Sequence, residues 1–356
     1  MAQSIIYGLV TLSILIIVHE LGHFLFARLS NVKVLIFSIG FGKRLITYKK
    51  GETEYVISLF PLGGYVKLLG ESPEEELRDE DVTRSYSHKS PLTKLMIAFS
   101  GPLANLVFAF FVFSLLLASG YKVLTTKVGN VEKGYPAYEA GIKKGDKILA
   151  IDGKKVEEWS DLTGILNDKK EGESVTLTVM DEKGIREVVL VPKVVESKTV
   201  FGEKIKRKVI GITASDEFMV KKEPFTQAVI KGLNQTVNLT FLTLVGIWKL
   251  LQGVISPSEI GGPLMIMEVA GKQAKEGKRN FLYFLGLISV NLAVINLLPI
   301  PVLDGGYILF HMIEVVSRKR ISPRWIEVSQ RIGMGVLIGI MVLAFFNDIM
   351  RMFHGK

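Results

Sequence analysis

Four long apolar runs constrain this chain more than any other feature. They extend over about Ile5–Ala27, Leu95–Ser119, Phe281–Ile300 and Ile332–Ile349. Each is long enough for a helix to cross the hydrocarbon core of a bilayer, which takes roughly 20 apolar residues. The charged residues, 22% of the chain, lie almost wholly outside these runs. We therefore expect an α-helical polytopic membrane protein with four transmembrane helices and a polar domain between the second and third.

The positive charges predict how the chain is oriented. Lysine and arginine gather between the first two runs and again just before the fourth, at Arg318, Lys319, Arg320 and Arg324. Loops rich in these residues stay in the cytoplasm. We therefore expect the N-terminus, the region from Gly120 to Asn280 and the C-terminus to lie outside. The net charge of +9 is spread over such loops, so no nucleic-acid partner is expected.

The polar middle of the chain has the pattern of a small α+β domain. Short β-type runs are separated by turn signals: Thr125–Val131, Lys147–Ile151, Ser174–Met180 and Arg186–Val191. Helical stretches fit near Ala137–Ala140 and Trp159–Asn167. After this domain, apolar residues at helical spacing from Phe225 to Phe241 predict an amphipathic helix on the membrane surface or on protein.

The chemistry is carried by His19-Glu20-Leu21-Gly22-His23, inside the first apolar run. On a helix the two histidines lie one turn apart on one face, where they can hold one zinc ion. Glu20 lies beside them and can act as general base on zinc-bound water. Ionisable residues inside a span are costly and usually mark function. The alternative is a polar trio that only bonds neighbouring helices.

Catalytic zinc usually takes a third protein ligand. The chain has no cysteine, and its other histidines are His88, His311 and His354. Asp304 is a better candidate, because it closes the third apolar run, where Pro299 and Pro301 must interrupt the helix. By its position alone, the favoured interpretation of Asp304 is a helix-terminal cap.

At this point the chain resembles the site-2 protease family, in the bacterial regulator-of-sigma-E protease group. The resemblance covers nearly the whole chain and rests on six segments: His19–His23, Asn296–Gly305, Gly40–Gly42, Pro61–Lys67, Ser100–Asn105 and a PDZ-like segment at 128–153. It implies that Asp304 is the third ligand of one Zn²⁺. It implies substrate contacts at Asn291, Asn296, Pro299, Pro301, Gly40, Phe41, Gly42, Gly63 and Gly64. Well-known members carry two PDZ domains, whereas this chain has room for one.

The resemblance also implies a function. The expected enzyme is an intramembrane zinc endopeptidase of the bacterial inner membrane, with its site towards the cytoplasmic side. Its substrates would be single-span membrane proteins, such as anti-sigma factors, or remnant signal peptides, cut in regulated intramembrane proteolysis. PDZ domains bind extended chain ends. A new chain end would thus contact Gly134, Tyr135, Pro136 and Ala137, although a folded spacer that binds nothing is the plainer alternative.

These expectations divide the chain into four parts: the first half of the membrane core at 1–119, a PDZ-like domain at 120–215, amphipathic helices at 216–280 and the second half of the core at 281–356. The first half contains the spans 5–27 and 95–119 and a re-entrant β region at 40–70. The second half contains the spans 281–300 and 332–349 and the Leu-Asp-Gly motif at 303–305.

Within the re-entrant region, Arg44–Lys49 and Thr53–Leu59 read as a β-hairpin. We hypothesise that the hairpin offers a free edge, to which an unwound substrate adds as a strand.

The expected zinc site also constrains how many times the chain crosses the membrane. Both His19–His23 and Asp304 lie late in their apolar runs. The first and third runs must therefore point the same way to reach one metal, and an odd number of crossings must separate them. A further apolar stretch, Leu239–Ile255, is therefore predicted to lie on or dip into the outer leaflet without crossing.

Two other classes of protein compete with this interpretation. One is a membrane-anchored PDZ adaptor with a vestigial metal site, which would not need both Glu20 and Asp304. The other is a membrane-anchored protease that acts on soluble chains, which would carry its His-Glu-x-x-His motif outside the apolar run.

Overall fold

The computed structural model describes residues 2–71, 77–199 and 202–354. These residues form two compact units. The first combines Met1–Leu116 with Thr226–Lys356, and the second is Leu117–Phe225. Each is described by itself.

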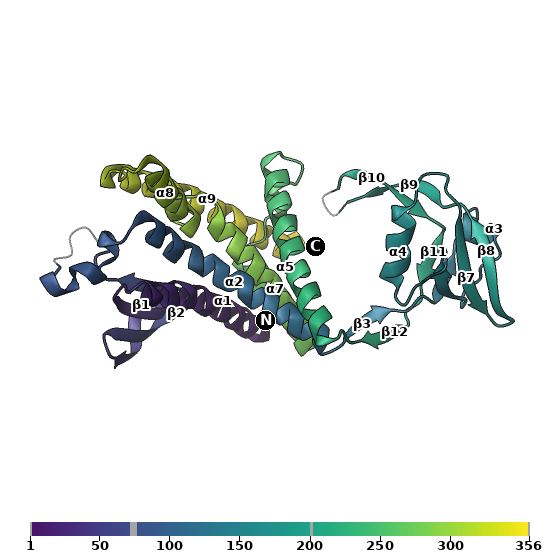
Figure 1. Cartoon of the computed structure of the whole chain (residues 1–356), viewed down its shortest axis with the longest axis horizontal. Helices are drawn as coiled ribbons and strands as arrows, with labels where there is room; N and C mark the ends of the chain where they lie inside the picture. Colours follow the sequence, from purple (N-terminus) through teal and green to yellow (C-terminus); the bar gives the residue numbers. More distant parts are fainter. Residues whose placement is uncertain (1, 72–76, 200–201, 355–356) are drawn as a thin grey trace. The chain divides into compact units, whose positions relative to one another are not determined.

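The first unit is built on long helices. Four of its described helices are long and apolar enough to cross a membrane, at Gln3–Leu29, Pro91–Ala118, Lys278–Leu297 and Arg324–Phe353. They correspond to α1 (Ala2–Leu29), α2 (Pro91–Ala118), α7 (Lys278–Leu297) and α9 (Pro323–His354). The four apolar runs of the sequence are thus four helices of membrane-spanning length, and α1, α2 and α7 lie side by side (Figure 1).

Helices α1 and α7 run in the same direction. Tyr7, near the start of α1, packs edge-on against Phe281, near the start of α7, with ring centroids 5.4 Å apart. At the other end, His19 of α1 lies against Asp304, which follows α7. Helix α2 runs the opposite way, because Arg279 at the start of α7 donates to the carbonyl of Leu116 at the end of α2. Helix α2 is therefore antiparallel to α1 and α7, which are parallel to each other.

The segment 225–251 is one helix, α5 (Phe225–Leu251), which joins the predicted amphipathic stripe to most of the Leu239–Ile255 stretch. Gly232 of α5 packs against Ser114 of α2, and the Thr243 hydroxyl donates to Asn291 Oδ1 of α7 at 2.8 Å. Leu239 and Ile247 also pack against the core between α2 and α7. Because Gln235 contacts Tyr283 and Thr243 contacts Asn291, α5 passes beside α7 in the same general direction.

Helix α6 (Pro263–Glu276) leads the chain back. Met267 packs at Gly8 of α1, and Gly271 packs at Ser4, so α6 runs antiparallel to α1. The short 3-10 helix η3 (Pro257–Glu259) connects α5 to α6. Helices α5 and α6 thus form a pair that goes along the bundle and returns, which keeps α1 and α7 parallel. That Leu239–Ile255 lies at the outer leaflet without crossing stays a prediction.

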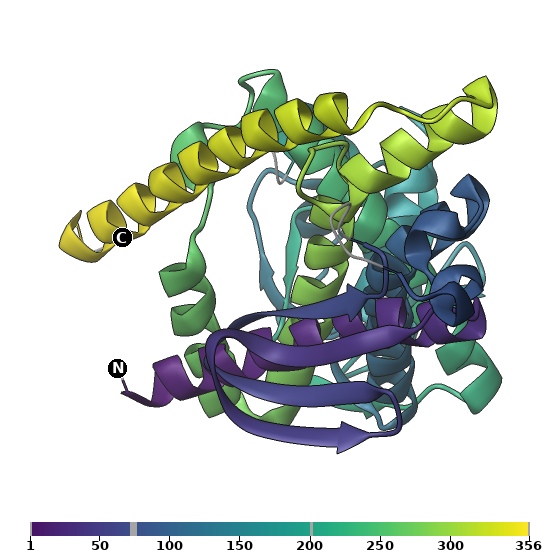
Figure 2. The same ribbon diagram turned by 90° about the vertical axis from the view of Figure 1, so that its left-hand side faces the viewer.

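A β-sheet lies between α1 and α2 in sequence. It consists of β1 (Val34–Lys50) and β2 (Thr53–Leu68), both longer than the predicted hairpin strands because each bends. Residues 53–57 pair with 46–50 on one side and with 36–39 on the other, and 36–39 pair in turn with 64–68. The two strands therefore make four antiparallel legs, and the legs 44–50 and 64–68 are the edges. The sheet lies beside α1 (Figure 2).

Glycines make the corner of β1. Gly40 and Gly42 have φ of +94° and +85°, a conformation that residues with a Cβ rarely adopt. The sheet packs on the second half of α1 through Phe24, Phe37 and neighbouring apolar residues. Its turn is tied to the 3-10 helix η1 (Asp79–Arg84), because the Arg84 guanidinium donates to Glu52 and lowers the pKa of that carboxyl. A second 3-10 turn, η2 (Tyr86–His88), leads to α2.

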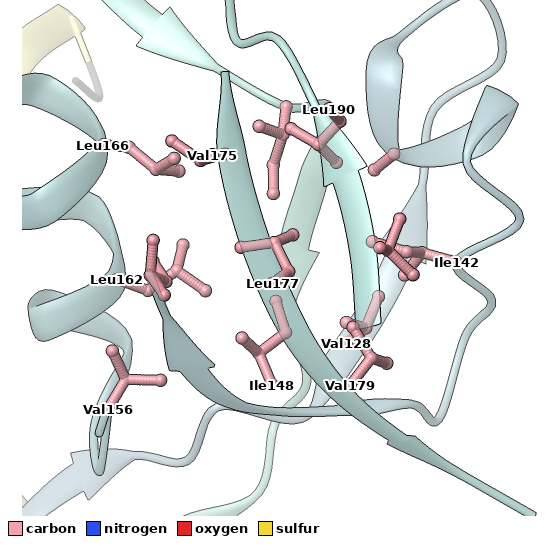
Figure 3. Packing of buried hydrophobic residues seen from close by; sticks show 14 residues of the cluster. Val128, Ile142, Ile148, Val156, Leu162, Leu166, Val175, Leu177, Val179 and Leu190 are labelled. Atoms are coloured by element: carbon pink, nitrogen blue, oxygen red, sulfur yellow. The ribbon is translucent and has the colours of Figure 1, made fainter. Parts of the chain in front are cut away.

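The second unit is a small α+β domain, as the pattern of the polar middle predicts. Its main sheet has the order β6-β5-β7-β8, from Lys154–Lys155, Lys147–Ile151, Val175–Asp181 and Gly184–Leu190. Helices α3 (Pro136–Glu139) and α4 (Trp159–Asp168) complete it. The core gathers alternate strand residues such as Ile148, Leu177 and Val179 with Leu162 and Leu166 of α4 (Figure 3).

Three further strand pairs complete this unit, each antiparallel. They are β4 (Val128–Val131) with β11 (Ile212–Ala214), β9 (Lys193–Lys198) with β10 (Lys204–Val209), and β3 (Tyr121–Leu124) with β12 (Phe218–Lys221). The last pair brings the entering and leaving ends of the unit together, so that the domain is inserted between α2 and α5.

Candidate metal centre

Helix α1 presents two imidazoles to one point. His19 and His23 lie one turn apart, and their Nε2 atoms are 3.2 Å from each other. His19 is 8% exposed as a residue, within the bundle of apolar helices. Two ring nitrogens this close, away from solvent, fit a shared cation because each can offer it a lone pair.

Asp304 joins them from the far end of the chain. Its Oδ2 lies 3.0 Å from His19 Nε2, and its Oδ1 lies 3.4 Å from His23 Nε2. The three ligand edges of a tetrahedral zinc site with bonds near 2.0 Å are about 3.3 Å long. The distances of 3.2, 3.0 and 3.4 Å among these three residues therefore match one triangular face of such a site.

The surroundings of the Asp304 carboxylate fit a bound cation better than a role as a helix cap. Asp304 is the first residue of α8 (Asp304–Ser317), the place that the capping interpretation assigned to it. Its Oδ2 is nevertheless buried and makes no well-oriented hydrogen bond, although His19 Nε2 is near. A buried oxygen without a partner costs free energy unless a ligand satisfies it. The donor set of two imidazoles and a carboxylate suits zinc.

The break between α7 and α8 turns Asp304 towards α1. Helix α7 ends at Leu297, ahead of Pro299 and Pro301, as the prolines predict. A Cβ at Gly305 would lie 2.1 Å from the Leu298 carbonyl oxygen, so only glycine lets α8 begin this close to the end of α7. Val302 has a φ of +110°, which is rare for a β-branched residue and is the kind of strain found at functional sites.

Glu20 lies next to this triangle and against the sheet. A Cβ at Gly64 would lie 2.8 Å from Glu20 Cγ, so the leg 64–68 touches the candidate general base. This leg is an edge of the sheet. The hypothesis of a free edge named residues 44–59 instead. The difference arises because the bends in β1 and β2, which create two more legs, have no simple alternating pattern.

The other predicted substrate-contact residues fall into two groups. Around the sheet corner, Phe41 stacks on Tyr65 with ring centroids 6.2 Å apart, and its ring covers Gly63. On α7, Asn291 accepts from Thr243 and is therefore partly engaged, while Asn296 sits in the last turn. Pro299 is exposed, and Pro301 packs against Gly306 and Gly333.

In the second unit, the four predicted peptide-contact residues form the entry to α3. Gly134 has a φ of +78°, and Pro136 is the first helical residue. Ala137 is fully buried and donates its N–H to the Ile210 carbonyl at 2.9 Å. A Cβ at Gly211 would clash with Tyr135. This stretch is thus packed against 210–211, so Ala137 has no free N–H for a peptide.

Three contributors to the centre were not singled out from the sequence, and all lie on α2. The Ile97 carbonyl lies 2.8 Å from His23 Nδ1, and Asn105 Nδ2 lies 3.2 Å from His19 Nδ1. A Cβ at Gly101 would lie 2.3 Å from His23 Nε2. Only the Ser100–Asn105 segment, noted for its resemblance, pointed to this helix.

A donor set of this kind, beside a glutamate and enclosed by helices of membrane-spanning length, defines the class of membrane-embedded metal-dependent proteases. The chain belongs to peptidase family M50, whose family model matches residues 7–340. This confirms the resemblance to the site-2 protease family. The protein is a zinc metalloprotease and an integral membrane protein.

Relatives of similar length support the same family. A Campylobacter jejuni protein named as a candidate zinc metalloprotease is 36% identical over 96% of this chain and 91% of its own length. A Helicobacter pylori protein with the same kind of name is 37% identical over 98% and 99%. A PDZ domain of an SdrC-like protein from Listeria monocytogenes matches 27% of this chain and 90% of that chain, at 23% identity and a TM-score of 0.21.

Proposed function

We propose that this protein cuts peptide bonds in or near the transmembrane segment of single-span membrane proteins. The observation that carries the proposal is the triangle of His19, His23 and Asp304, with edges of 3.0–3.4 Å, set among helices long enough to span a bilayer. A protease whose site lies there acts on chains that also enter the membrane. Anti-sigma factor-like proteins or remnant signal peptides, cut in regulated intramembrane proteolysis, are the substrate classes of this proposal.

We assign the roles within the centre as follows. His19, His23 and Asp304 would hold one zinc ion. Zinc supplies a polarised carbonyl and a water of lowered pKa when it is bound. Glu20, beside the three ligands, would be the general base and would carry the proton to the leaving amine.

The edge leg 64–68 supports a way to hold the substrate. A peptide bond in a helix is shielded, because its carbonyl is already hydrogen-bonded. An extended chain added to the sheet at this leg would replace those helical hydrogen bonds. It would then lie next to Glu20, which Gly64 touches. The stacked Phe41 and Tyr65 and the amides of Asn291 and Asn296 are the further substrate contacts of this proposal.

The orientation follows the positive-inside rule. We place the protein in a bacterial cytoplasmic membrane, with the N-terminus, the second unit and the C-terminus outside. We also place the β1–β2 sheet as a re-entrant element, because its corner exposes Phe41, Ile46 and Phe60. Binding of a new chain end by the second unit stays a prediction, without Ala137 as a contact.

The test is cleavage of a single-span reporter by the wild type, Glu20→Gln and Asp304→Asn. We expect Glu20→Gln to cleave at least about 100-fold more slowly, since it removes a proton acceptor. It should keep zinc, whereas Asp304→Asn should lose both cleavage and zinc. Matched controls are Glu182→Gln and Asp168→Asn, because both side chains are exposed and neither belongs to the proposed metal centre. Undiminished cleavage by either test variant would refute its assigned role.

The same experiment addresses the adaptor alternative. An adaptor with a vestigial metal site would bind the reporter without cutting it, and Glu20→Gln would change nothing. A protease restricted to soluble chains would cut a soluble reporter as fast as the membrane-inserted one.

A further inference from the structure

The two histidines of the centre can hold a metal only in one tautomer. Each points Nε2 at the shared position, so Nε2 must carry the lone pair and Nδ1 must carry the proton. The partner of Nδ1 selects this tautomer, because only an acceptor at Nδ1 favours a proton there.

The partner of His23 makes this selection. Its Nδ1 lies 2.8 Å from the carbonyl oxygen of Ile97 on α2. A carbonyl oxygen can only accept, so His23 Nδ1 donates and Nε2 is left free. The same carbonyl also accepts from the Ser100 hydroxyl at 2.6 Å, which fixes its place.

The partner of His19 is the amide of Asn105, two turns further along α2. As placed, Asn105 Nδ2 lies 3.2 Å from His19 Nδ1. An NH₂ group there would make Nδ1 the acceptor and move the proton to Nε2, towards Asp304 and His23. At the same time Asn105 Oδ1 is buried without a hydrogen-bond partner.

A half-turn of this amide gives His19 Nδ1 the acceptor that the metal-binding tautomer requires. The oxygen and nitrogen of an asparagine amide are nearly the same in shape, so their assignment follows from the hydrogen bonds they make. With Oδ1 at His19 Nδ1, the imidazole donates to the amide, and the oxygen is no longer unpaired. The metal-binding tautomer of His19, with its proton on Nδ1, therefore selects the orientation that places Oδ1 at Nδ1.

Asn105 is well placed for this role because nothing around it can shift easily. It has no exposed surface. Its backbone carbonyl accepts from the Ser289 hydroxyl of α7 at 2.8 Å. Three helices thus meet at Asn105, and its side chain has no route to solvent.

We propose that Asn105 is a positioning residue for the metal centre, whose side-chain carbonyl oxygen accepts from His19 Nδ1 and holds that imidazole in the metal-binding tautomer. It does for His19 what the Ile97 carbonyl does for His23. This inference rests on the proposed ligand roles of His19 and His23.

The test compares Asn105→Asp with Asn105→Leu in the purified full-length protein. Zinc affinity is measured by competition with a chelator, and thermal unfolding of the metal-free protein reports on the fold. Loss of such a partner of a metal-bound histidine typically weakens metal binding 10–100-fold. We expect about this loss in Asn105→Leu. We expect Asn105→Asp, which keeps an acceptor at the same place, to bind zinc no more than about threefold more weakly than the wild type.

Several outcomes decide the matter. Zinc binding by Asn105→Leu within threefold of the wild type overturns the inference, and so does an Asn105→Asp variant as weak as the leucine variant. If Asn105→Leu does not fold, Asn105→Ala takes its place, with the same expected loss. Ser289→Ala, which removes only the contact to the Asn105 backbone, is the matched control and should lose less affinity than Asn105→Leu.

The His19→Ala variant tests the ligand role of His19 separately from the positioning role of Asn105. If it abolishes zinc binding while Asn105→Leu does not weaken it, the ligand roles stand and only the role of Asn105 falls. If His19→Ala binds zinc normally, the proposed metal centre itself is wrong.

Discussion

At the scale of single residues, the metal centre depends on glycines of α1 and α2, which leave room for the two imidazoles. The imidazoles of His19 and His23 lie directly over Gly101 of α2, where a Cβ would come within 3 Å of both rings. Gly22, between the two histidines, lets the same helices touch, because a Cβ there would lie 2.2 Å from the Ser100 carbonyl oxygen. These two glycines set how close α1 and α2 can come.

Gly101→Ala should therefore impair the centre. The added methyl must displace His23 Nε2, which would lie 2.3 Å away, and a displaced ring no longer points at the shared position. We expect at least about a tenfold loss of zinc affinity, as for disturbed ligand orientation in general. The measurement is chelator competition together with reporter cleavage.

The control for this prediction is Gly339→Ala in α9. No atom lies within 4 Å of a Cβ at Gly339, and its backbone is helical. This change should leave zinc binding intact and stabilise the helix slightly. Equal zinc affinity in Gly101→Ala and the wild type would contradict the close approach.

At the scale of elements, the bend of β1 decides which part of the sheet meets the active-site helix. A straight hairpin would pair 44–50 with 53–58 and no more. Because β1 turns at Gly40 and Gly42, its first leg pairs on both sides and leaves 64–68 as the edge beside Glu20. The corner thus links backbone conformation to the proposed site of strand addition.

Gly40→Ala should lower both stability and cleavage. Gly40 has a φ of +94°, and a Cβ there would lie 2.9 Å from the Phe60 carbonyl oxygen, so the substitution adds a clash to an unfavourable backbone. Gly51→Ala is the matched control, since Gly51 has a φ of +64° but open space around it. The control should cost only the left-handed conformation, roughly 1 kcal/mol, and keep cleavage.

Thermal unfolding and reporter cleavage of the two variants check this comparison. If Gly40→Ala is no worse than Gly51→Ala in both assays, the corner does not position the edge leg.

At the scale of the whole molecule, the direction of each helix accounts for the meeting of two distant segments. His19 and Asp304 come from opposite ends of the chain, yet they face each other because α1 and α7 run parallel. The pair α5 and α6 runs along the bundle and back, because α5 points the same way as α7 and α6 runs antiparallel to α1.

Single cysteines can test this topology, because the natural chain contains none. We expect a cysteine in place of Lys319 to react with a membrane-impermeant thiol reagent only from the cytoplasmic side, and one in place of Lys169 only from the outside. A cysteine at Lys249 should not react from the cytoplasm, because the parity of the spans predicts that Leu239–Ile255 does not cross. Cytoplasmic labelling at Lys249 would mean that α5 crosses. Cleavage activity shows which cysteine variants are intact.

The sequence by itself determined the apolar helices, the strand pattern of the second unit, and the pairing of His19 with His23. These follow from local rules: a length that matches the bilayer, alternation along strands, and one helical turn between two residues. The end of α7 at Leu297 was likewise predictable from Pro299 and Pro301, which remove backbone donors.

The tertiary structure alone decided everything that needs two distant segments to meet. Position could not tell Asp304 from a helix cap, and the resemblance to a family was needed until its oxygens were seen 3.0 and 3.4 Å from the two histidines. Asn105, Gly101 and the edge leg 64–68 lie in or near segments noted for their resemblance, but their roles could not be predicted because these depend on which atoms lie opposite them. Spacing along a helix fixes a face, but only packing between helices fixes what that face contacts.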